Sequence, residues 1–280
     1  MIRPGTDPAL ALGFAGVIMR EKLYDADFVR RFTDLPRLVR LDTREPLLAR
    51  DVFPAYKESE LTNWVKVLPT GTAAVRTIDQ NGMQIPEALR GEFADFVMWD
   101  ARSRKPVAVS RDMVGARFTA ANIDPALEGT FDVTLADGTT IKARTVFDLT
   151  REYLDNSMSP ADVEKITWAP AAAVESLARA IARNGGQTLF AVGMGPNQFF
   201  NNDLKDRAIF LVAALTGSIG RMGGNVGSYA GNYRTSLFSG IPLYAAEDPF
   251  NAQLDPAAPV KVKSYVRYED RKSTRLNSSH

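Results

Sequence analysis

The sequence predicts an α/β fold in which helices flank a parallel sheet and a β-hairpin-rich segment is inserted in the middle. Both ends of the chain alternate helical patterns with apolar strands, as in QTLFAVGMG followed by LKDRAIFLVAALTG, which is the rhythm of a parallel sheet. The middle instead carries paired alternating segments around polar turns. The composition, 45% hydrophobic and 24% charged, is that of a globular protein with a substantial core.

Residues 1–48 form the first part of the predicted α/β domain. Asp7 and Pro8 are suited to the N-cap and first position of a helix. Its buried face is predicted from the spacing of Leu10, Phe14, Val17 and Ile18. DADFVRRFT, from Asp25, predicts a second short helix, and PRLVRLD, from Pro36, a short strand or extended piece.

Residues 49–145 are predicted to form a β-rich insertion or small lobe. FADFVMWDARSRKPVAVS indicates two strands around a polar turn. TFDVTLADGTTIKARTV is a stronger hairpin, because alternation on both sides flanks Asp137-Gly138, a dipeptide suited to a type I′ turn.

Residues 146–268 form the second part of the α/β domain. VFDLTREYLDN and SPADVEKITW predict helices, the second with Ser159 as N-cap. PAAAVESLARAIARNG predicts a third helix with one apolar face, made by Val174, Leu177, Ala178 and Ile181. Gln187–Gly195 is predicted to be a buried strand that runs into a glycine-containing turn. Together these elements favour a Rossmann-like parallel sheet.

Residues 270–280, DRKSTRLNSSH, are set apart from the fold. The segment back-translates to a common sequencing-library adapter, so we interpret it as an adapter-derived artefact tail. The alternative is a disordered basic tail. The only histidine of the chain, His280, lies in it, so histidine chemistry has no place in the remaining sequence.

Composition excludes several kinds of site. A formal net charge of +1 gives no electrostatic argument for nucleic acid. The absence of cysteine excludes a cysteine-bound iron–sulfur cluster, a cysteine zinc site and a disulfide within this chain. No carboxylate pair stands out as general acid and base, so no catalytic residue and no metal ligand is predicted. If the chain belongs to an enzyme, a bound cofactor must supply the chemistry.

Three segments could bind such a cofactor, and each has a simpler interpretation. In RPGTD, the Asp7 carboxylate could accept two parallel N–H bonds from guanine, or it could only cap the helix. The loop VGMGPNQFFNND follows a strand, where α/β proteins bind ligands, but it fits no nucleotide fingerprint and could be an ordinary connection. TGSIGRMGGNVGSYAGNYR is either a flexible loop or backbone that a ligand approaches closely.

Taken together, RPGTD, VGMGPNQFFNNDLKDRAIFLVAALTG and SIGRMGGNVGSYAGNYR resemble the large catalytic subunit of the molybdopterin oxidoreductases, the dimethyl sulfoxide reductase family. The segment DFVRRFTDLPRLVRLDT is similar to the corresponding sequences in the branch of this family that contains nitrate reductase, nitrite oxidoreductase and ethylbenzene dehydrogenase. The resemblance covers roughly residues 1–48 and 146–268 and is less clear between them. It implies a Mo-bis(molybdopterin guanine dinucleotide) cofactor.

The resemblance also implies roles for individual positions. Gly5, Thr6 and Asp7 match the motif that receives the guanine end of one cofactor half. The loop that lies along the same dinucleotide is matched by Gly193, Met194, Gly195 and Asn197. The glycine-rich segment that runs close to the pterin and pyrophosphate is matched by Gly223, Gly224, Gly231, Asn232 and Tyr233.

Other parts of the family pattern are missing. Relatives hold a 4Fe-4S cluster and the molybdenum ligand upstream of the position where this chain begins. The resemblance therefore implies an internal fragment, inactive by itself, of an enzyme that works with an iron–sulfur electron-transfer subunit and a membrane or haem subunit. Such a complex would lie on the cytoplasmic or periplasmic face of a membrane, and this sequence does not identify the compartment.

The first expectation for the substrate is nitrate reduction or nitrite oxidation. Hydrocarbon hydroxylation is the alternative within the enzyme class, and a structural relative that has lost molybdenum is the alternative outside it. A standalone α/β binding protein is a further interpretation, which requires the chain to be complete.

Overall fold

The computed structural model describes residues 2–59, 68–70, 73–75, 94–110, 113–193 and 202–228. The chain divides into two compact units, the first formed by Met1–Asn63 and Gln84–Tyr229 and the second by Trp64–Met83 and Ala230–His280. Within the second unit, the description covers β2 (Leu68–Thr70) and β3 (Ala73–Val75), which pair in antiparallel fashion. All further elements belong to the first unit.

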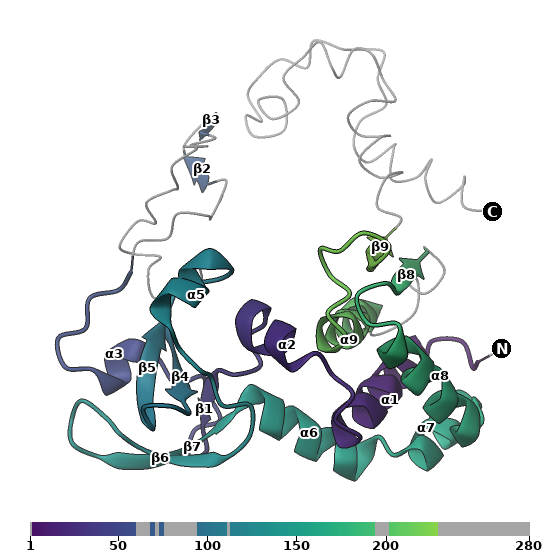
Figure 1. The fold of residues 1–280 in the computed structure, drawn as a ribbon, viewed down its shortest axis with the longest axis horizontal. Helices are drawn as coiled ribbons and strands as arrows, with labels where there is room; N and C mark the ends of the chain where they lie inside the picture. The colour runs from purple at the N-terminus through teal and green to yellow at the C-terminus, as the bar shows by residue number, and fades with distance from the viewer. Residues whose placement is uncertain are drawn as a thin grey trace. The chain divides into compact units, whose positions relative to one another are not determined.

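Figure 1 shows the elements of the first unit in two groups, one mainly helical and one mainly of antiparallel strands. Its helices are α1 (Asp7–Arg20), α2 (Ala26–Phe32), α3 (Ala49–Val52), α5 (Ala116–Ala121), α6 (Val146–Ser157), α7 (Pro160–Thr167), α8 (Ala171–Arg183) and α9 (Asn202–Leu215). Its strands are β1 (Leu38–Arg40), β4 (Phe96–Asp100), β5 (Lys105–Val109), β6 (Thr130–Thr134), β7 (Thr140–Thr145), β8 (Leu189–Val192) and β9 (Asn225–Ser228).

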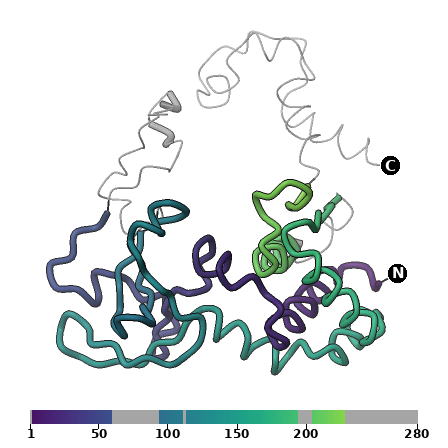
Figure 2. The backbone as a smooth tube through the Cα atoms, viewed as in Figure 1, coloured from purple at the N-terminus to yellow at the C-terminus, as the bar shows by residue number. Residues whose placement is uncertain are grey.

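Helix α1 is the centre of the helical group. It packs against α6, α7, α8 and α9, and the tube in Figure 2 shows it enclosed by these later segments. Its side chains are buried on more than the one predicted face, because Ala15, Ile18 and Met19 are all almost fully inaccessible. A small residue on α1 lets a neighbouring helix approach closely: a Cβ on Gly13 would lie 2.7 Å from Cγ2 of Val163 in α7.

Helices α6, α7 and α8 confirm the three helices predicted after residue 145. Ser159 caps α7 as expected, since its Oγ accepts the N–H of Asp162 at 3.2 Å. The predicted face of α8 is correct for Val174, Ala178 and Ile181, which join the helical core. Leu177 is instead 50% exposed, because the helix presents a narrower face to its neighbours than the pattern indicated.

The strands between residues 38 and 145 build the antiparallel group. β7 lies between β1 and β6, and β4 pairs with β5. The predicted hairpin is confirmed, with Thr134 opposite Thr140. The prediction of a type I′ turn is wrong, because that turn needs a positive φ at both central residues. Gly138 has a φ of +87°, whereas Asp137 is not among the residues with positive φ. The N–H of Leu135 bonds to the Thr139 carbonyl at 2.7 Å, so the turn is a longer one with glycine in the left-handed position.

The strand predicted from Pro36 joins this antiparallel sheet. Leu38 pairs with Thr145 and Arg40 with Ala143, so the segment just after α2 already belongs to the β group. Its core contains Leu38, Leu47, Val97 and Val133, separate from the helical core. The predicted domain limits at residues 48 and 145 stay predictions.

A mixed α/β fold with a hairpin-rich middle is confirmed, whereas the Rossmann-like parallel sheet stays a prediction. Among the described residues, parallel pairing joins β8 and β9. The strand predicted to be buried, β8, is largely open: Leu189 is 60% exposed, and only Val192 of its four residues is buried. Apolar composition alone did not distinguish a central strand from one with an open face.

None of the helices in the described segments is long and apolar enough to cross a membrane.

Candidate functional site

The turn before α1 is built by Pro4 and Gly5. The N–H of Thr6 bonds to the Arg3 carbonyl at 3.3 Å, and the Thr6 hydroxyl donates to the same oxygen at 2.6 Å. Gly5 has a φ of +79°. Proline followed by a residue with positive φ is the signature of a type II turn, so glycine is required here for the backbone itself.

Asp7 is the first residue of α1, and the N-cap is Thr6. The predicted capping role of Asp7 is therefore wrong, because the turn places the cap one residue earlier. Within the described parts of the chain, the half-exposed carboxylate of Asp7 has neither a hydrogen bond nor an ion pair. It remains free to accept N–H groups from a ligand, which removes the competition that the sequence left open.

Strands β8 and β9 run parallel to each other. The parallel register pairs Leu189 with Asn225 and Val192 with Ser228, so both strands end at the same edge. Gly193 follows Val192 directly, and a Cβ on it would meet nothing within 4 Å. Of the predicted cofactor-binding residues that follow β8 or β9 in the sequence, six lie outside the described residues: Met194, Gly195, Asn197, Gly231, Asn232 and Tyr233.

Gly223 and Gly224 lie at the opposite, amino end of the parallel pair. They precede Asn225, the first residue of β9. A Cβ on Gly224 would lie 2.4 Å from the Ser218 carbonyl oxygen and 2.8 Å from that of Gly186. Gly223 has a φ of +84° and open space around it. Gly224 thus has a packing role of its own, and a binding role for either glycine stays a prediction.

The start of the glycine-rich segment is ordered by its own contacts. Thr216 and Ser218 are buried and their hydroxyl oxygens lie 2.9 Å apart. Ser218 Oγ accepts the N–H of Gly186 at 3.3 Å. The Arg221 guanidinium contacts the Asp25 carboxylate at 3.2 Å. Residues 216–228 are therefore a built connection into β9 rather than a flexible linker. The sequence did not predict β9, because NVGS offers one β-branched residue among small polar ones.

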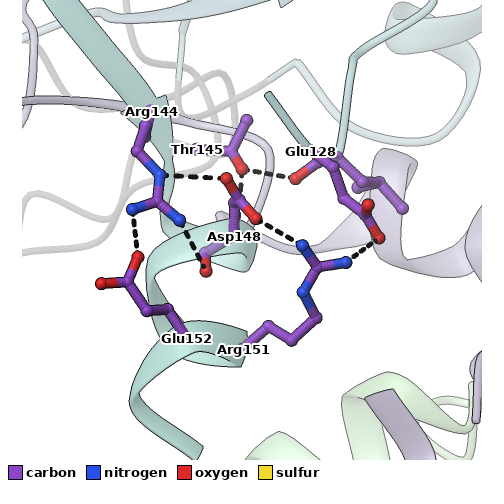
Figure 3. Close-up of polar contacts among 7 residues, drawn as sticks. Glu128, Arg144, Thr145, Asp148, Arg151 and Glu152 are labelled. Atoms are coloured by element: carbon purple, nitrogen blue, oxygen red, sulfur yellow. Dashed lines mark hydrogen bonds and ion pairs between the residues drawn. The ribbon is translucent and has the colours of Figure 1, made fainter. Parts of the chain in front are cut away.

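A network of charged side chains joins β7, α6 and the loop before β6 (Figure 3). Asp148 Oδ2 accepts from Arg144 Nε at 3.0 Å, and its Oδ1 accepts from Arg151 at 2.8 Å. Arg151 also contacts Glu128 at 2.6 Å, and Arg144 contacts Glu152. Burial opposes the charge on Arg144, yet its carboxylate partners outweigh burial and raise its pKa.

The same junction is closed by Thr145, the N-cap of α6. Its Oγ1 accepts the N–H of Asp148 at 3.0 Å and donates to the Leu127 carbonyl. Every carboxylate of the network is paired with arginine, so the network holds elements together and has no free group for chemistry. The sequence did not predict this network, because Arg144 lies in β7 and Asp148 in α6, so their spacing of four residues is not that of a pair on one helix.

Among the described residues, no group of three His, Cys, Asp or Glu side chains could hold a metal ion. Two groups could thus bind a cofactor. One is the free Asp7 carboxylate at the start of α1, and the other is the backbone at the carboxyl edge of β8 and β9. A carboxylate and open backbone can bind N–H groups and anionic or polar ligands.

Similarity to known proteins defines the class. No protein-family model matches the chain. The perchlorate reductase alpha subunit of Dechloromonas aromatica is 33% identical over 247 residues, which are 87% of this chain and 25% of that protein. The respiratory nitrate reductase alpha subunit of Haloferax mediterranei is 30% identical over 236 residues, 84% of this chain and 21% of that protein. The dimethylsulfide dehydrogenase alpha subunit of Rhodovulum sulfidophilum is 30% identical over 228 residues, 80% of this chain and 20% of that protein.

These similarities identify an oxidoreductase polypeptide. The chain belongs to the molybdopterin oxidoreductase family, among its alpha subunits. It spans about a quarter of the length of the perchlorate reductase subunit and about a fifth of the nitrate reductase subunit.

Proposed function

We propose that this chain is the part of a molybdenum oxidoreductase catalytic subunit that holds one guanine dinucleotide half of Mo-bis(molybdopterin guanine dinucleotide). Family membership supports the molybdenum cofactor, since perchlorate and nitrate reductase alpha subunits match along more than four fifths of the chain. The dinucleotide form of the cofactor is part of the proposal.

The free carboxylate of Asp7 is the observation that carries this proposal. Guanine presents an N1–H and an exocyclic amine side by side, and a carboxylate can accept both through its two oxygens. A carboxylate already engaged as an N-cap could not do so fully. Thr6 occupies the N-cap instead, and Gly5 makes the turn that leads Asp7 into the first turn of α1. The residues at this position therefore fit a guanine base.

The remainder of the dinucleotide is assigned to the carboxyl edge of β8 and β9. Gly193, Met194, Gly195 and Asn197 follow β8, and Gly231, Asn232 and Tyr233 follow β9. Ligands of open α/β sheets bind beyond the carboxyl ends of strands, and backbone N–H groups there suit a pyrophosphate. The proposal leaves out Gly223 and Gly224, because both precede β9.

For the whole protein, we infer reduction of nitrate or oxidation of nitrite. When bound, the molybdenum cofactor supplies two-electron oxygen-atom transfer. Nitrate, two electrons and two protons give nitrite and water, and nitrite oxidation is the reverse. Relatives named nitrate reductase support this choice, and the perchlorate reductase also takes an oxyanion by name. The described residues of this chain contribute binding and orientation of the cofactor rather than a proton-transfer group.

The electron path is also assigned to other parts of the protein. The relatives are named alpha subunits, which supports a complex with an electron-transfer partner. We infer an iron–sulfur partner subunit and a 4Fe-4S cluster in a part of the protein outside this chain, because the chain contains no cysteine.

Substitution of Asp7 in the whole enzyme tests the guanine assignment. Asp7→Asn should lose most of its molybdenum and most of the GMP released by acid hydrolysis, because an amide replaces one acceptor oxygen with a donor. The matched control is Asp27→Asn, which removes the acidic residue from the first turn of α2 and should leave both contents unchanged. Unchanged GMP content in Asp7→Asn would contradict the proposal.

The dehydrogenase direction is a second candidate, because one relative is named dimethylsulfide dehydrogenase. Hydrocarbon hydroxylation belongs to that class of reaction. The two candidates separate when one preparation is assayed with nitrate and a reduced dye, with nitrite and an oxidised dye, and with ethylbenzene and an oxidised dye. Turnover only with ethylbenzene would replace the nitrate assignment, and a preparation without molybdenum would indicate a structural relative.

A further inference from the structure

Trp168 is held in an unusual position at the end of α7. It is the C-cap of that helix, its φ is +65°, and its N–H bonds to the Glu164 carbonyl at 2.8 Å. Glycine or asparagine adopts this left-handed conformation with less strain than a bulky aromatic residue. The indole is also 65% exposed, so burial of apolar area does not account for a tryptophan here.

The exposed indole lies beside the turn that carries Asp7. The N–H of Arg3 bonds to the Thr167 carbonyl at 2.8 Å, which ties the start of the chain to the end of α7. The Arg3 guanidinium lies over the Trp168 ring, 5.7 Å from its centroid. The Arg3 carbonyl in turn accepts both bonds from Thr6, the residue next to Asp7. Arg3 therefore connects the two groups: its guanidinium lies over the Trp168 ring, and its carbonyl oxygen bonds to Thr6, which precedes Asp7.

The contact with Arg3 shows what this ring can accept. The Arg3 guanidinium is within cation–π range of the ring, and much of the Trp168 side chain still faces solvent. A purine base is a larger flat group that stacks on the same kind of surface. An indole and a carboxylate bind different parts of one base, the face and the hydrogen-bonding edge.

We propose that Trp168 is the stacking surface for the purine base whose edge Asp7 binds. This inference rests on the guanine site proposed above. Stacking is insensitive to the kind of base, whereas the carboxylate favours guanine over adenine. The two residues thus divide their tasks: Trp168 contributes affinity for a purine, and Asp7 contributes the choice of guanine.

The test uses GDP and ADP as probes of the full cofactor-free chain, with dissociation constants from calorimetry and quenching of tryptophan fluorescence. Trp168→Gly should weaken GDP and ADP binding about tenfold each. Its thermal midpoint should not fall, because glycine relieves the left-handed strain. Trp168→Phe should keep most of the affinity. Asp7→Asn should remove the preference for GDP over ADP.

Tyr153→Ala is the matched control, because it removes another exposed aromatic side chain, on α6, and should not change either affinity. Unchanged GDP binding in a folded Trp168→Gly variant, with preference lost in Asp7→Asn, would overturn the stacking role and leave the guanine site intact. Absence of GDP binding in the unsubstituted chain would overturn both.

Discussion

Val192 and Ser228 are register partners at the ends of two parallel strands. Their pairing places Gly193 at the carboxyl edge and Gly223 and Gly224 at the amino edge of the same pair of strands. The glycines of this region therefore lie at opposite ends of the pair, and substitutions can test whether their tasks differ.

Gly224 should be required for folding. Gly224→Ala would put a Cβ against two carbonyl oxygens of the backbone, those of Ser218 and Gly186, and should lower the free energy of unfolding by about 2–3 kcal/mol. Gly223→Ala meets open space and adds only left-handed strain, about 1–2 kcal/mol. Urea unfolding of both variants measures the difference, and equal losses would show that the contacts of Gly224 relax at no cost.

Gly223 should also be dispensable for the cofactor. In the whole enzyme, Gly223→Val should keep its GMP content, because the residue precedes β9 and lies away from the proposed carboxyl edge. Loss of GMP from a Gly223→Val enzyme with normal stability would return this glycine to the binding site.

Asp148 should be a strong stabilising residue. Asp148→Asn removes the carboxylate that Arg144 and Arg151 share in a poorly accessible junction, while Glu152 and Glu128 remain as partners, and the expected loss in unfolding free energy is about 2 kcal/mol. Asp132→Asn is the control, because Asp132 pairs with Lys142 while both side chains are mostly exposed, and its expected loss is below about 1 kcal/mol. Equal losses measured by urea unfolding would show that the network of Figure 3 is no stronger than a surface pair.

Asp100 should make stability depend on acid pH. The Ser103 hydroxyl, helped by backbone N–H groups that include that of Asp124 at 2.9 Å, lowers the Asp100 pKa from 3.8 to about 2 against the opposing effect of burial. The unfolded chain therefore takes up a proton first, so this stabilisation is complete above pH ~4 and is lost as the pH falls toward 2. The stability difference between the natural chain and Asp100→Asn should shrink over that interval, as unfolding at pH 5 and pH 2.5 would show.

Gly13 should set the spacing of α1 and α7. Gly13→Ala gains helix propensity, about 1 kcal/mol, but its Cβ would lie 2.7 Å from the buried Val163 side chain, and overpacking of this kind costs about 1–3 kcal/mol. We expect a net decrease in thermal midpoint. In a Val163→Ala background, the same Gly13→Ala change should raise the midpoint. A decrease of the same size in both backgrounds would refute the contact.

Local patterns in the sequence predicted local structure well. Ser159 and Pro160 marked the start of α7, and alternation around Gly138 located the β6–β7 hairpin, because caps and hairpins depend on neighbours in the chain. The pairing of β1 with β7 and of β8 with β9 depends on distant segments, so periodicity carried no information about either. The same applies to Leu177, whose apolar spacing matched a face that the other helices leave exposed.

The candidate site, too, could be predicted from the sequence only in part. Asp7 was identified as a guanine ligand or a cap, and the sequence alone could not decide because both roles use the same oxygens. The backbone turn at Pro4 and Gly5 makes Thr6 the N-cap residue, which removes the capping role of Asp7, and its role as a guanine ligand stays a proposal. The sequence did not indicate Trp168 as part of the site. Its proximity to this turn arises from a hydrogen bond between Arg3 and Thr167, which are far apart in the chain.

The enclosure of α1 has a consequence for how the protein is made. This helix is synthesised before its packing partners α6 to α9, which follow more than a hundred residues later, and α9 ends only at Leu215. A largely apolar helix must therefore remain without its native neighbours while the whole β group is translated. During that interval the face that later packs on α6 to α9 stays uncovered by them, so we expect synthesis of this chain to depend on chaperones that bind exposed apolar helices.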